Sequence, residues 1–92
     1  MAEKRAHVII SGRVQGVNYR SYTRQQAQMQ GIRGWVRNRA DGRVEAVFEG
    51  GEDALQRMIA WCHKGPPAAR VESVDVHWED FEGTFTGFHT RW

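Results

Sequence analysis

The 92-residue chain contains one cysteine, two prolines and two lysines, and it has no long hydrophobic run. A single cysteine excludes an internal disulfide and fits a reducing compartment. No segment approaches the roughly 20 apolar residues of a membrane span, and residues 1–5 lead into a predicted strand without the apolar region of a signal peptide. We therefore expect a soluble, cytoplasmic protein that forms one domain, residues 1–92.

The formal net charge is only +2, which is too small to indicate a polyanionic partner such as nucleic acid. Eleven of the thirteen basic residues are nevertheless arginines. The planar guanidinium suits phosphate better than a lysine ammonium does, so this bias is compatible with a phosphate ligand. Genome composition or selection for stability would produce the same bias.

Residues 10–20, with the sequence ISGRVQGVNYR, predict a strand that enters a glycine-containing loop and then a helix. Such a loop points several backbone N–H groups at one place, where the helix dipole also favours an anion. Arg20 falls in the first turn of this helix, where a cation is unfavourable unless an anion lies beside it. The stretch therefore predicts an anion site, with a tolerated surface arginine as the alternative.

The order of the predicted elements indicates the fold class. They are strand 7–10, helix 20–30, strands 34–39 and 43–49, a helix from 52 to the Gly65-Pro66-Pro67 stop, strand 71–78 and a last edge strand, 85–92. This βαββαβ order plus an edge strand predicts an α+β fold of the ferredoxin-like split βαβ type. In that fold an antiparallel sheet carries both helices on one face.

Hydrophobic periodicity predicts which faces are buried. The first helix has only a weak stripe, since Tyr22 and Met29 are seven residues apart and Ala27 offers little bulk. Side chains alternate between the two faces of strand 71–78, and Val74, Val76 and Trp78 are expected to point inward. The second helix has a clear i, i+3, i+4, i+7 stripe, formed by Leu55, Met58, Ile59 and Cys62.

Asn38 ends a predicted strand and shares a face with Val36. An amide beside the core face must find partners or border a pocket. The other interpretation is a turn residue that satisfies local backbone groups ahead of Asp41-Gly42, a good hairpin signal. From the residue pattern alone, the turn interpretation is favoured.

Two motifs resemble the signatures of the acylphosphatase family: Gly12–Arg20 (GRVQGVNYR) and Gly34–Ala46 (GWVRNRADGRVEA). The similarity extends from about Arg5 to the end of the chain. Tyr19 stands where the family usually has phenylalanine, a change that keeps the aromatic ring. Arg39 stands where many members have threonine, which could alter how Asn38 is held.

The resemblance implies hydrolysis of small acyl phosphates to carboxylate and inorganic phosphate, without a metal or other cofactor. It assigns catalysis to Arg20, which would bind the phosphoryl group, and Asn38, which would orient the attacking water. The loop that would cradle the phosphate comprises Gln15, Gly16, Val17, Asn18, Tyr19 and Arg20. We expect a monomer with no nucleic-acid or membrane partner. The alternative is a non-catalytic module that binds phosphate or a protein partner.

Three other chemistries fit the sequence less well. A metal site lacks ligand spacing and a carboxylate cluster, although four histidines are available, His7, His63, His77 and His89. Cys62 falls on the buried stripe of a helix, where a thiol is inert. RNA binding by this βαββαβ order needs aromatics on the central strands, but residues 44–48 lack the expected pattern and residues 7–10 contain no aromatic.

Overall fold

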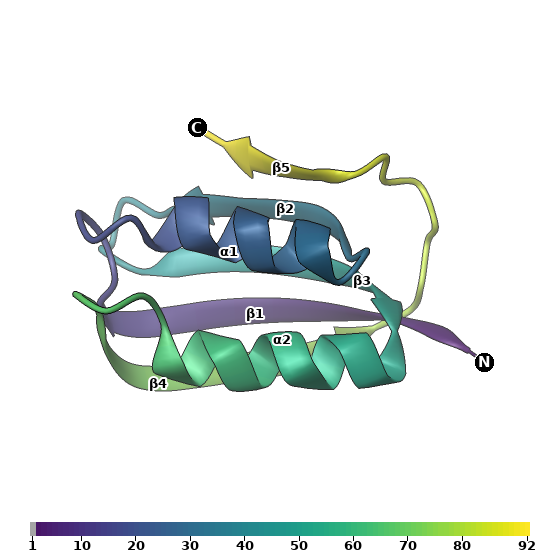
Figure 1. The fold of residues 1–92 in the computed structure, drawn as a ribbon, viewed down its shortest axis with the longest axis horizontal. Coiled ribbons are helices and arrows are strands. Elements are labelled where there is room, and N and C mark those ends of the chain that lie inside the picture. The colour runs from purple at the N-terminus through teal and green to yellow at the C-terminus, as the bar shows by residue number, and fades with distance from the viewer. Residues whose placement is uncertain (1) are drawn as a thin grey trace.

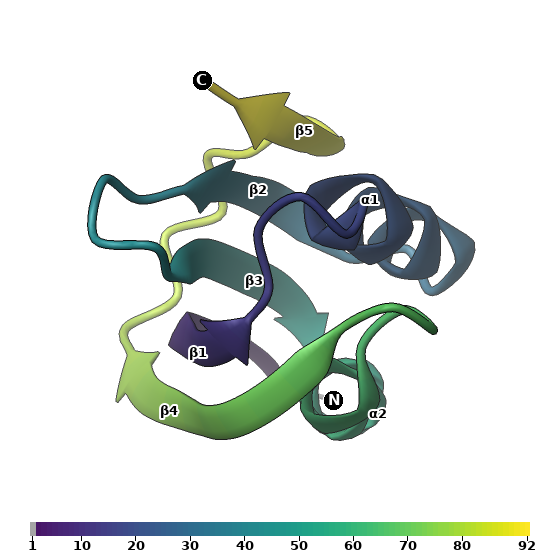
Figure 2. The same cartoon turned by 90° about the vertical axis from the view of Figure 1, so that its left-hand side faces the viewer.

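The computed structural model describes residues 2–92, which form a five-stranded sheet with two helices on one face (Figures 1 and 2). The elements are, in order, β1 (Glu3–Arg13), α1 (Tyr19–Met29), β2 (Arg33–Asn38), β3 (Val44–Gly51), α2 (Glu52–Lys64), β4 (Arg70–Glu79) and β5 (Phe88–Arg91). This confirms the predicted ferredoxin-like α+β fold with an additional edge strand. No helix within residues 2–92 is long and apolar enough to cross a membrane.

The strand order across the sheet is β4-β1-β3-β2-β5, so β1 is central, as its apolar residues predict. β1 pairs antiparallel with both β3 and β4, and β2 pairs antiparallel with β3. The edge strand differs from the expectation of an antiparallel sheet, because β5 runs parallel to β2, with Gly34 opposite Phe88. The sheet is therefore mixed: the chain leaves β4 and crosses to the opposite edge before β5 begins (Figure 2).

Glu49 holds this crossover against the helix-free face of the sheet. Its carboxylate, which is fully buried, accepts the backbone N–H groups of Glu82 and Gly83 at 3.0 and 3.2 Å. The Arg5 guanidinium lies 3.2 Å from the same carboxylate. Burial opposes ionisation of Glu49, but these hydrogen bonds outweigh it and hold the pKa below its usual value. The connection to β5 is thus fixed by a buried charge.

The buried face of α1 differs from the predicted stripe. Tyr22 and Met29 are 38% and 79% exposed. Of the predicted residues Ala27 is buried, and it is joined by Tyr19 and Thr23. The polar Thr23 can be buried because its hydroxyl donates to the Tyr19 carbonyl oxygen at 2.8 Å. A threonine at the centre of the stripe hides it from a hydrophobicity pattern.

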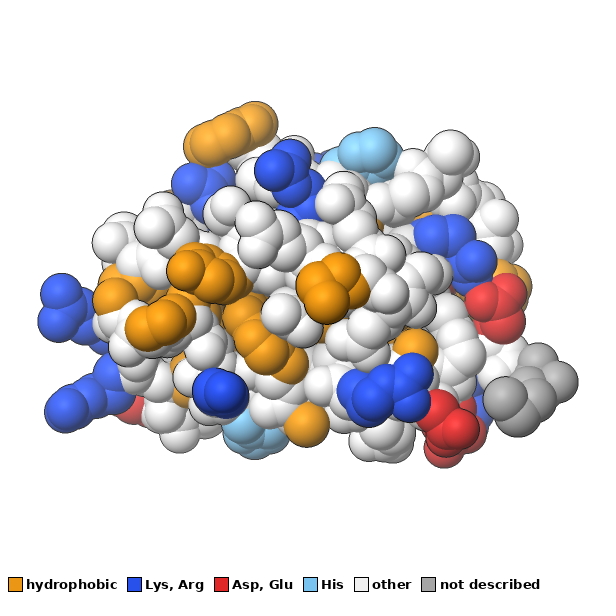
Figure 3. All heavy atoms as spheres, viewed as in Figure 1, with side chains coloured by type: hydrophobic (Ala, Val, Ile, Leu, Met, Phe, Trp, Pro, Cys, Tyr) orange, Lys and Arg blue, Asp and Glu red, His pale blue; other side chains and the backbone are white. Residues whose placement is uncertain are grey.

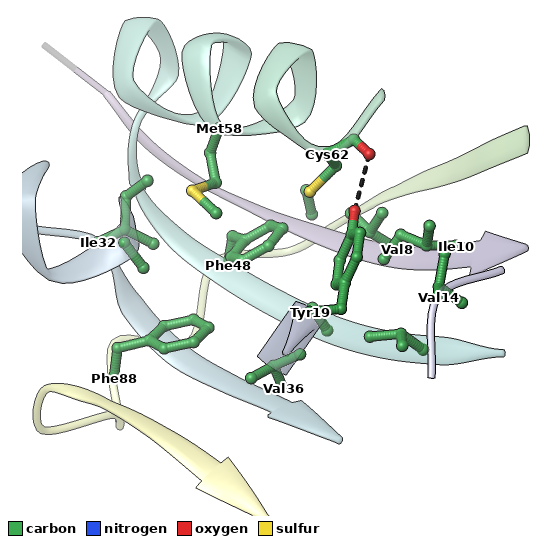
Figure 4. Close-up of a cluster of buried hydrophobic side chains, with 14 of the residues drawn as sticks. Val8, Ile10, Val14, Tyr19, Ile32, Val36, Phe48, Met58, Cys62 and Phe88 are labelled. Carbon is green, nitrogen blue, oxygen red and sulfur yellow. Dashed lines mark hydrogen bonds between the residues drawn. The ribbon is translucent and has the colours of Figure 1, made fainter. Parts of the chain in front are cut away.

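The predicted face of α2 is confirmed. Leu55, Met58 and Cys62 are buried and pack with Phe48 of β3. Figure 4 shows Met58, Cys62 and Phe48. Trp78 was expected to point inward, but it is 47% exposed. It lies on β4, an edge strand flanked only by β1, so its large ring is covered from one side only.

Candidate functional site

The loop that leads into α1 starts at a break in the sheet. The register between β1 and β4 shifts between Ser11 and Gly12. Gly12 has φ 124°, and a Cβ there would lie 2.3 Å from the Arg70 carbonyl oxygen. Only glycine fits this close approach, so the position fixes where the chain leaves the sheet.

The loop then uses two left-handed residues, Gly16 with φ 75° and Asn18 with φ 64°. Asn18 immediately precedes α1, where asparagine tolerates this conformation better than most residues. The backbone N–H groups of residues 15–20 have no acceptor among the described residues. They are therefore free to bind an anion at the positive end of the helix.

The two helix N-termini differ in charge. α2 begins with Glu52 and Asp53, whereas α1 has no acidic residue in its first turn and has Arg20 there instead. Within residues 2–92, Arg20 forms no ion pair with a carboxylate. On the helix-bearing face, most of the visible acidic side chains gather at the end where α2 begins (Figure 3). The first turn of α1 therefore combines two positive contributions, the dipole and Arg20, without a built-in counter-charge.

Asn38 is the last residue of β2 and is half-buried, with Val44 opposite it in β3. Its side-chain amide forms no hydrogen bond with any residue in the range 2–92. The turn is satisfied by other groups, since the Asp41 carboxylate accepts the Arg43 N–H at 3.1 Å. Asn38 is therefore not used as a turn residue, which was the favoured interpretation of the pattern alone.

Gln15 connects the loop to this turn. Its side-chain amide donates to the carbonyl oxygens of Arg39 and Arg43, both at 2.8 Å. Sequence reasoning assigned Gln15 only a backbone N–H. The partners lie 24 and 28 residues away, so no local signal in the sequence indicates the contact. It fixes the loop before α1 against the residues that follow Asn38.

One cavity of about 500 Å³ brings most of these groups together. The predicted residues that line it are Gly16, Asn18, Tyr19, Arg20 and Asn38. Gln15 and Val17 do not line it, and Val17 is buried. Lining residues that the sequence analysis missed are Ser21, Arg24, His89, Thr90 and Trp92. Three of these come from β5 and the residue after it, which pattern reasoning had no means to place beside α1.

Trp92 lies over the Arg20 guanidinium, with 4.3 Å from the Arg20 Cζ atom to the ring centroid. A cation over an indole face is attracted by the ring quadrupole. The N–H donors lie in the plane of the guanidinium, and Arg20 has no carboxylate partner among residues 2–92. Arg20 therefore keeps its capacity to bind oxygen beside the indole.

Tyr19 and Cys62 are adjacent in the core and take no part in acid–base chemistry (Figure 4). Burial and the Cys62 contact raise the pKa of Tyr19, so its hydroxyl stays neutral. Burial also raises the pKa of the Cys62 thiol to about 12, which excludes a thiolate nucleophile at neutral pH.

The histidines do not assemble a metal site. Among residues 2–92 there is no group of three or more His, Cys, Asp or Glu side chains that could hold a metal ion. His7 contacts the Glu45 carboxylate at 2.6 Å on the helix-free face of the sheet. His89 contacts the Thr86 carbonyl oxygen, also at 2.6 Å.

Fold and pocket together define a small ferredoxin-like domain whose cavity is bordered by a glycine-containing loop at a helix N-terminus. Residues 6–90 match the family model described as Acylphosphatase. The chain is 53% identical over 88 residues to an acylphosphatase of Pelotomaculum thermopropionicum, which covers 96% of both chains. It is 56% identical over 92 residues to an acylphosphatase of Haloarcula marismortui, which covers 100% of both. The chain belongs to the acylphosphatase family.

A solved structure supports the same assignment. The crystal structure of the acylphosphatase from Bacillus subtilis superposes with a TM-score of 0.94 at 34% identity, over 97% of this chain and 99% of that chain. The resemblance read from the two motifs is therefore confirmed, as is the fold.

Proposed function

We propose that the pocket between the β1–α1 loop and the end of β2 hydrolyses the carboxyl–phosphate bond of small acyl phosphates. The free N–H groups of residues 15–20 and the Arg20 guanidinium would bind the phosphoryl oxygens, and the Asn38 amide would orient the attacking water. The observation that carries this is that one cavity holds both Arg20 and Asn38 and that, within residues 2–92, Arg20 has no carboxylate partner and the Asn38 side chain has no hydrogen bond. Family membership supports the reaction.

The chemistry suits a site that has positioning groups and no strong base. The water oxygen forms a bond to phosphorus, and the bond from phosphorus to the acyl oxygen breaks. The electron pair leaves with a carboxylate, whose conjugate acid has a pKa of about 4, so departure needs little help from a general acid. The water protons pass to the phosphate and to solvent. Phosphoryl transfer of this kind is accelerated mainly by positioning and electrostatic stabilisation.

Arg39, which stands where many family members have threonine, leaves the site intact in this proposal. The Arg39 guanidinium lies 3.1 Å from the Asp41 carboxylate, and the Arg39 N–H donates to the Arg43 carbonyl oxygen at 2.8 Å. Together with the amide of Gln15, these contacts fix the turn that follows Asn38. Arg39 therefore takes part in holding Asn38 in position.

The proposal extends to conditions and partners. We infer that the chain acts as a cytoplasmic monomer, without a metal or other cofactor, and without a nucleic-acid partner. The small formal net charge of +2 supports the last point, because a polyanionic partner usually requires a stronger positive charge.

The test is inorganic phosphate release from acetyl phosphate in the presence of a metal chelator. We expect rapid release by the unmodified chain and a loss of about 100-fold or more in kcat for Asn38→Ala, with little change in the inhibition constant of inorganic phosphate. Arg20→Ala should impair both quantities. Arg57→Ala, at an exposed arginine of α2, is the matched control and should behave as the unmodified chain. A folded chain that binds phosphate but releases none would favour the non-catalytic module.

A further inference from the structure

Trp92 is the most exposed of the large hydrophobic side chains in the described part of the chain, at 95%, yet it is not an isolated surface residue. Its ring is stacked on Arg20 and lines the same cavity as Asn38. A single exposed tryptophan needs no explanation by itself. A tryptophan that contacts Arg20, the cation expected to bind the substrate, does need an explanation.

The strand register explains how Trp92 reaches this place. β5 runs parallel to β2, and Arg91 is the partner of Arg37. The residues that follow these two partners are Trp92 and Asn38, so both stand at the same end of the sheet, where β2 gives way to its turn. Trp92 therefore borders the site from the edge of the sheet.

The stack on Arg20 leaves room for phosphate. The Arg20 Cζ atom lies over the indole ring, and phosphate oxygens would be bound by the N–H groups at the edge of the guanidinium. Ring and phosphate can contact Arg20 at the same time, which places the bound phosphate beside the indole. The acyl group, joined to the phosphate through one oxygen, then lies against the ring or points past it.

The rest of the cavity lining offers little apolar surface to an acyl group. Val14 and Tyr19 line the cavity but are 0% and 1% exposed, and the remaining lining side chains are polar or absent, as at Gly16. Trp92 is the one lining residue of the described chain that exposes a large apolar surface. An aromatic or extended apolar acyl group would cover this surface, and an acetyl group is too small to do so.

We propose that Trp92 forms the wall of an acyl subsite and that it selects acyl phosphates with aromatic or extended apolar acyl groups over short ones. This inference rests on the proposed function, because it concerns the substrate class of the same pocket. Trp92 would be a specificity-determining residue. The step that breaks the bond to phosphorus would remain the task of Arg20 and Asn38.

The experiment compares kcat/KM for benzoyl phosphate and acetyl phosphate in four proteins: the unmodified chain, Trp92→Ala, Trp92→Phe and Trp78→Ala. Trp78 is a matched control, since it is also exposed but lies on β4, at the opposite edge of the sheet. The benzoyl-to-acetyl ratio of kcat/KM should fall about tenfold in Trp92→Ala. Trp92→Phe should restore most of it, because phenylalanine keeps a ring, and Trp78→Ala should leave it unchanged.

The inhibition constant of inorganic phosphate separates this role from simple positioning of Arg20. If Trp92 acts on the acyl group, this constant should change by less than about twofold in Trp92→Ala. Equal losses with both substrates together with weaker phosphate inhibition would overturn the proposal and leave Trp92 a positioning residue. An unchanged ratio would overturn it as well. Failure of the unmodified chain to release phosphate from either substrate would instead contradict the proposed function.

Discussion

The Tyr19 hydroxyl donates a hydrogen bond of 2.7 Å to the carbonyl oxygen of Cys62 (Figure 4). This contact joins the first residue of α1 to the last turn of α2, where helix carbonyl groups lack intrahelical partners. The Tyr19 ring also lies 5.5 Å from the ring of Trp61. The residue that starts α1 is thereby fixed to the neighbouring helix.

Tyr19→Phe removes the donor and leaves the Cys62 carbonyl oxygen without its partner in the core. We expect the free energy of unfolding to fall by about 1–3 kcal/mol, the usual cost of a buried acceptor that loses its hydrogen bond. Urea unfolding measures this. Turnover of acetyl phosphate should stay within about twofold, because the hydroxyl points away from the reacting groups. Tyr22→Phe, at an exposed position on the same helix, is the control and should change neither quantity.

Gln15→Ala should lower kcat while the protein remains folded. The substitution removes both hydrogen bonds between the loop and the carbonyl oxygens of Arg39 and Arg43, so Asn38 and the loop N–H groups are no longer held at a fixed separation. A displacement of about 1 Å can cost about 100-fold in rate. Steady-state kinetics with acetyl phosphate tests this, and circular dichroism monitors the fold. Wild-type kcat in folded Gln15→Ala would show that the connection is dispensable.

Asn18→Ala should destabilise the protein more than Asn18→Gly. The left-handed conformation, φ 64°, costs alanine about 1 kcal/mol but costs glycine little. We therefore expect a clear loss in the free energy of unfolding for the alanine variant and a small change for the glycine variant. Thermal and urea unfolding of the pair measures the difference. Equal destabilisation by both would mean that the Asn18 side chain, and not its backbone, stabilises the loop.

Stability should fall in acid partly because of Glu49. Its pKa in the folded protein lies below the usual value of 4.5, so its contribution is complete above about pH 4.5 and is lost as the pH falls through the lower, folded pKa. Glu49→Gln should lower the melting temperature at neutral pH and reduce its dependence on pH below about 4.5. Calorimetry across the acid range tests this. Glu72→Gln, at an exposed position on β4, should reproduce the unmodified profile.

The residue pattern predicts the fold and singles out Arg20, whereas Asn38 was predicted as a site residue only through the two family motifs. Gly12 and Gly16 occupy the special backbone positions that their place before a helix predicts. Arg20 breaks the charge preference of a helix start, and the structure brings it into one cavity with Asn38. These features are local, because each depends on residues within a few positions along the chain.

What the sequence did not show depends on contacts between distant segments. The amide of Gln15 finds its partners across 24 and 28 residues, and Trp92 meets Arg20 only because β5 pairs parallel with β2. The sequence pattern of a four-residue strand such as β5 does not indicate whether the strand pairs parallel or antiparallel with its neighbour. The buried face of α1 was missed for a different reason, since Thr23 is polar and its burial depends on a hydrogen bond to Tyr19.

The pairing of Arg5 with both Glu49 and Glu79 has a consequence for how the protein folds. These partners lie 44 and 74 residues away along the chain, so β1 is enclosed only after two long loops have closed. Domains dominated by such non-local contacts fold more slowly than helical domains of similar size. A nascent chain that ends before β4 contains Arg20 and Asn38 but has no β4 to enclose β1, the strand from which the phosphate loop departs. The pocket and the complete sheet are therefore acquired together, and no stable half of this chain is expected to be active.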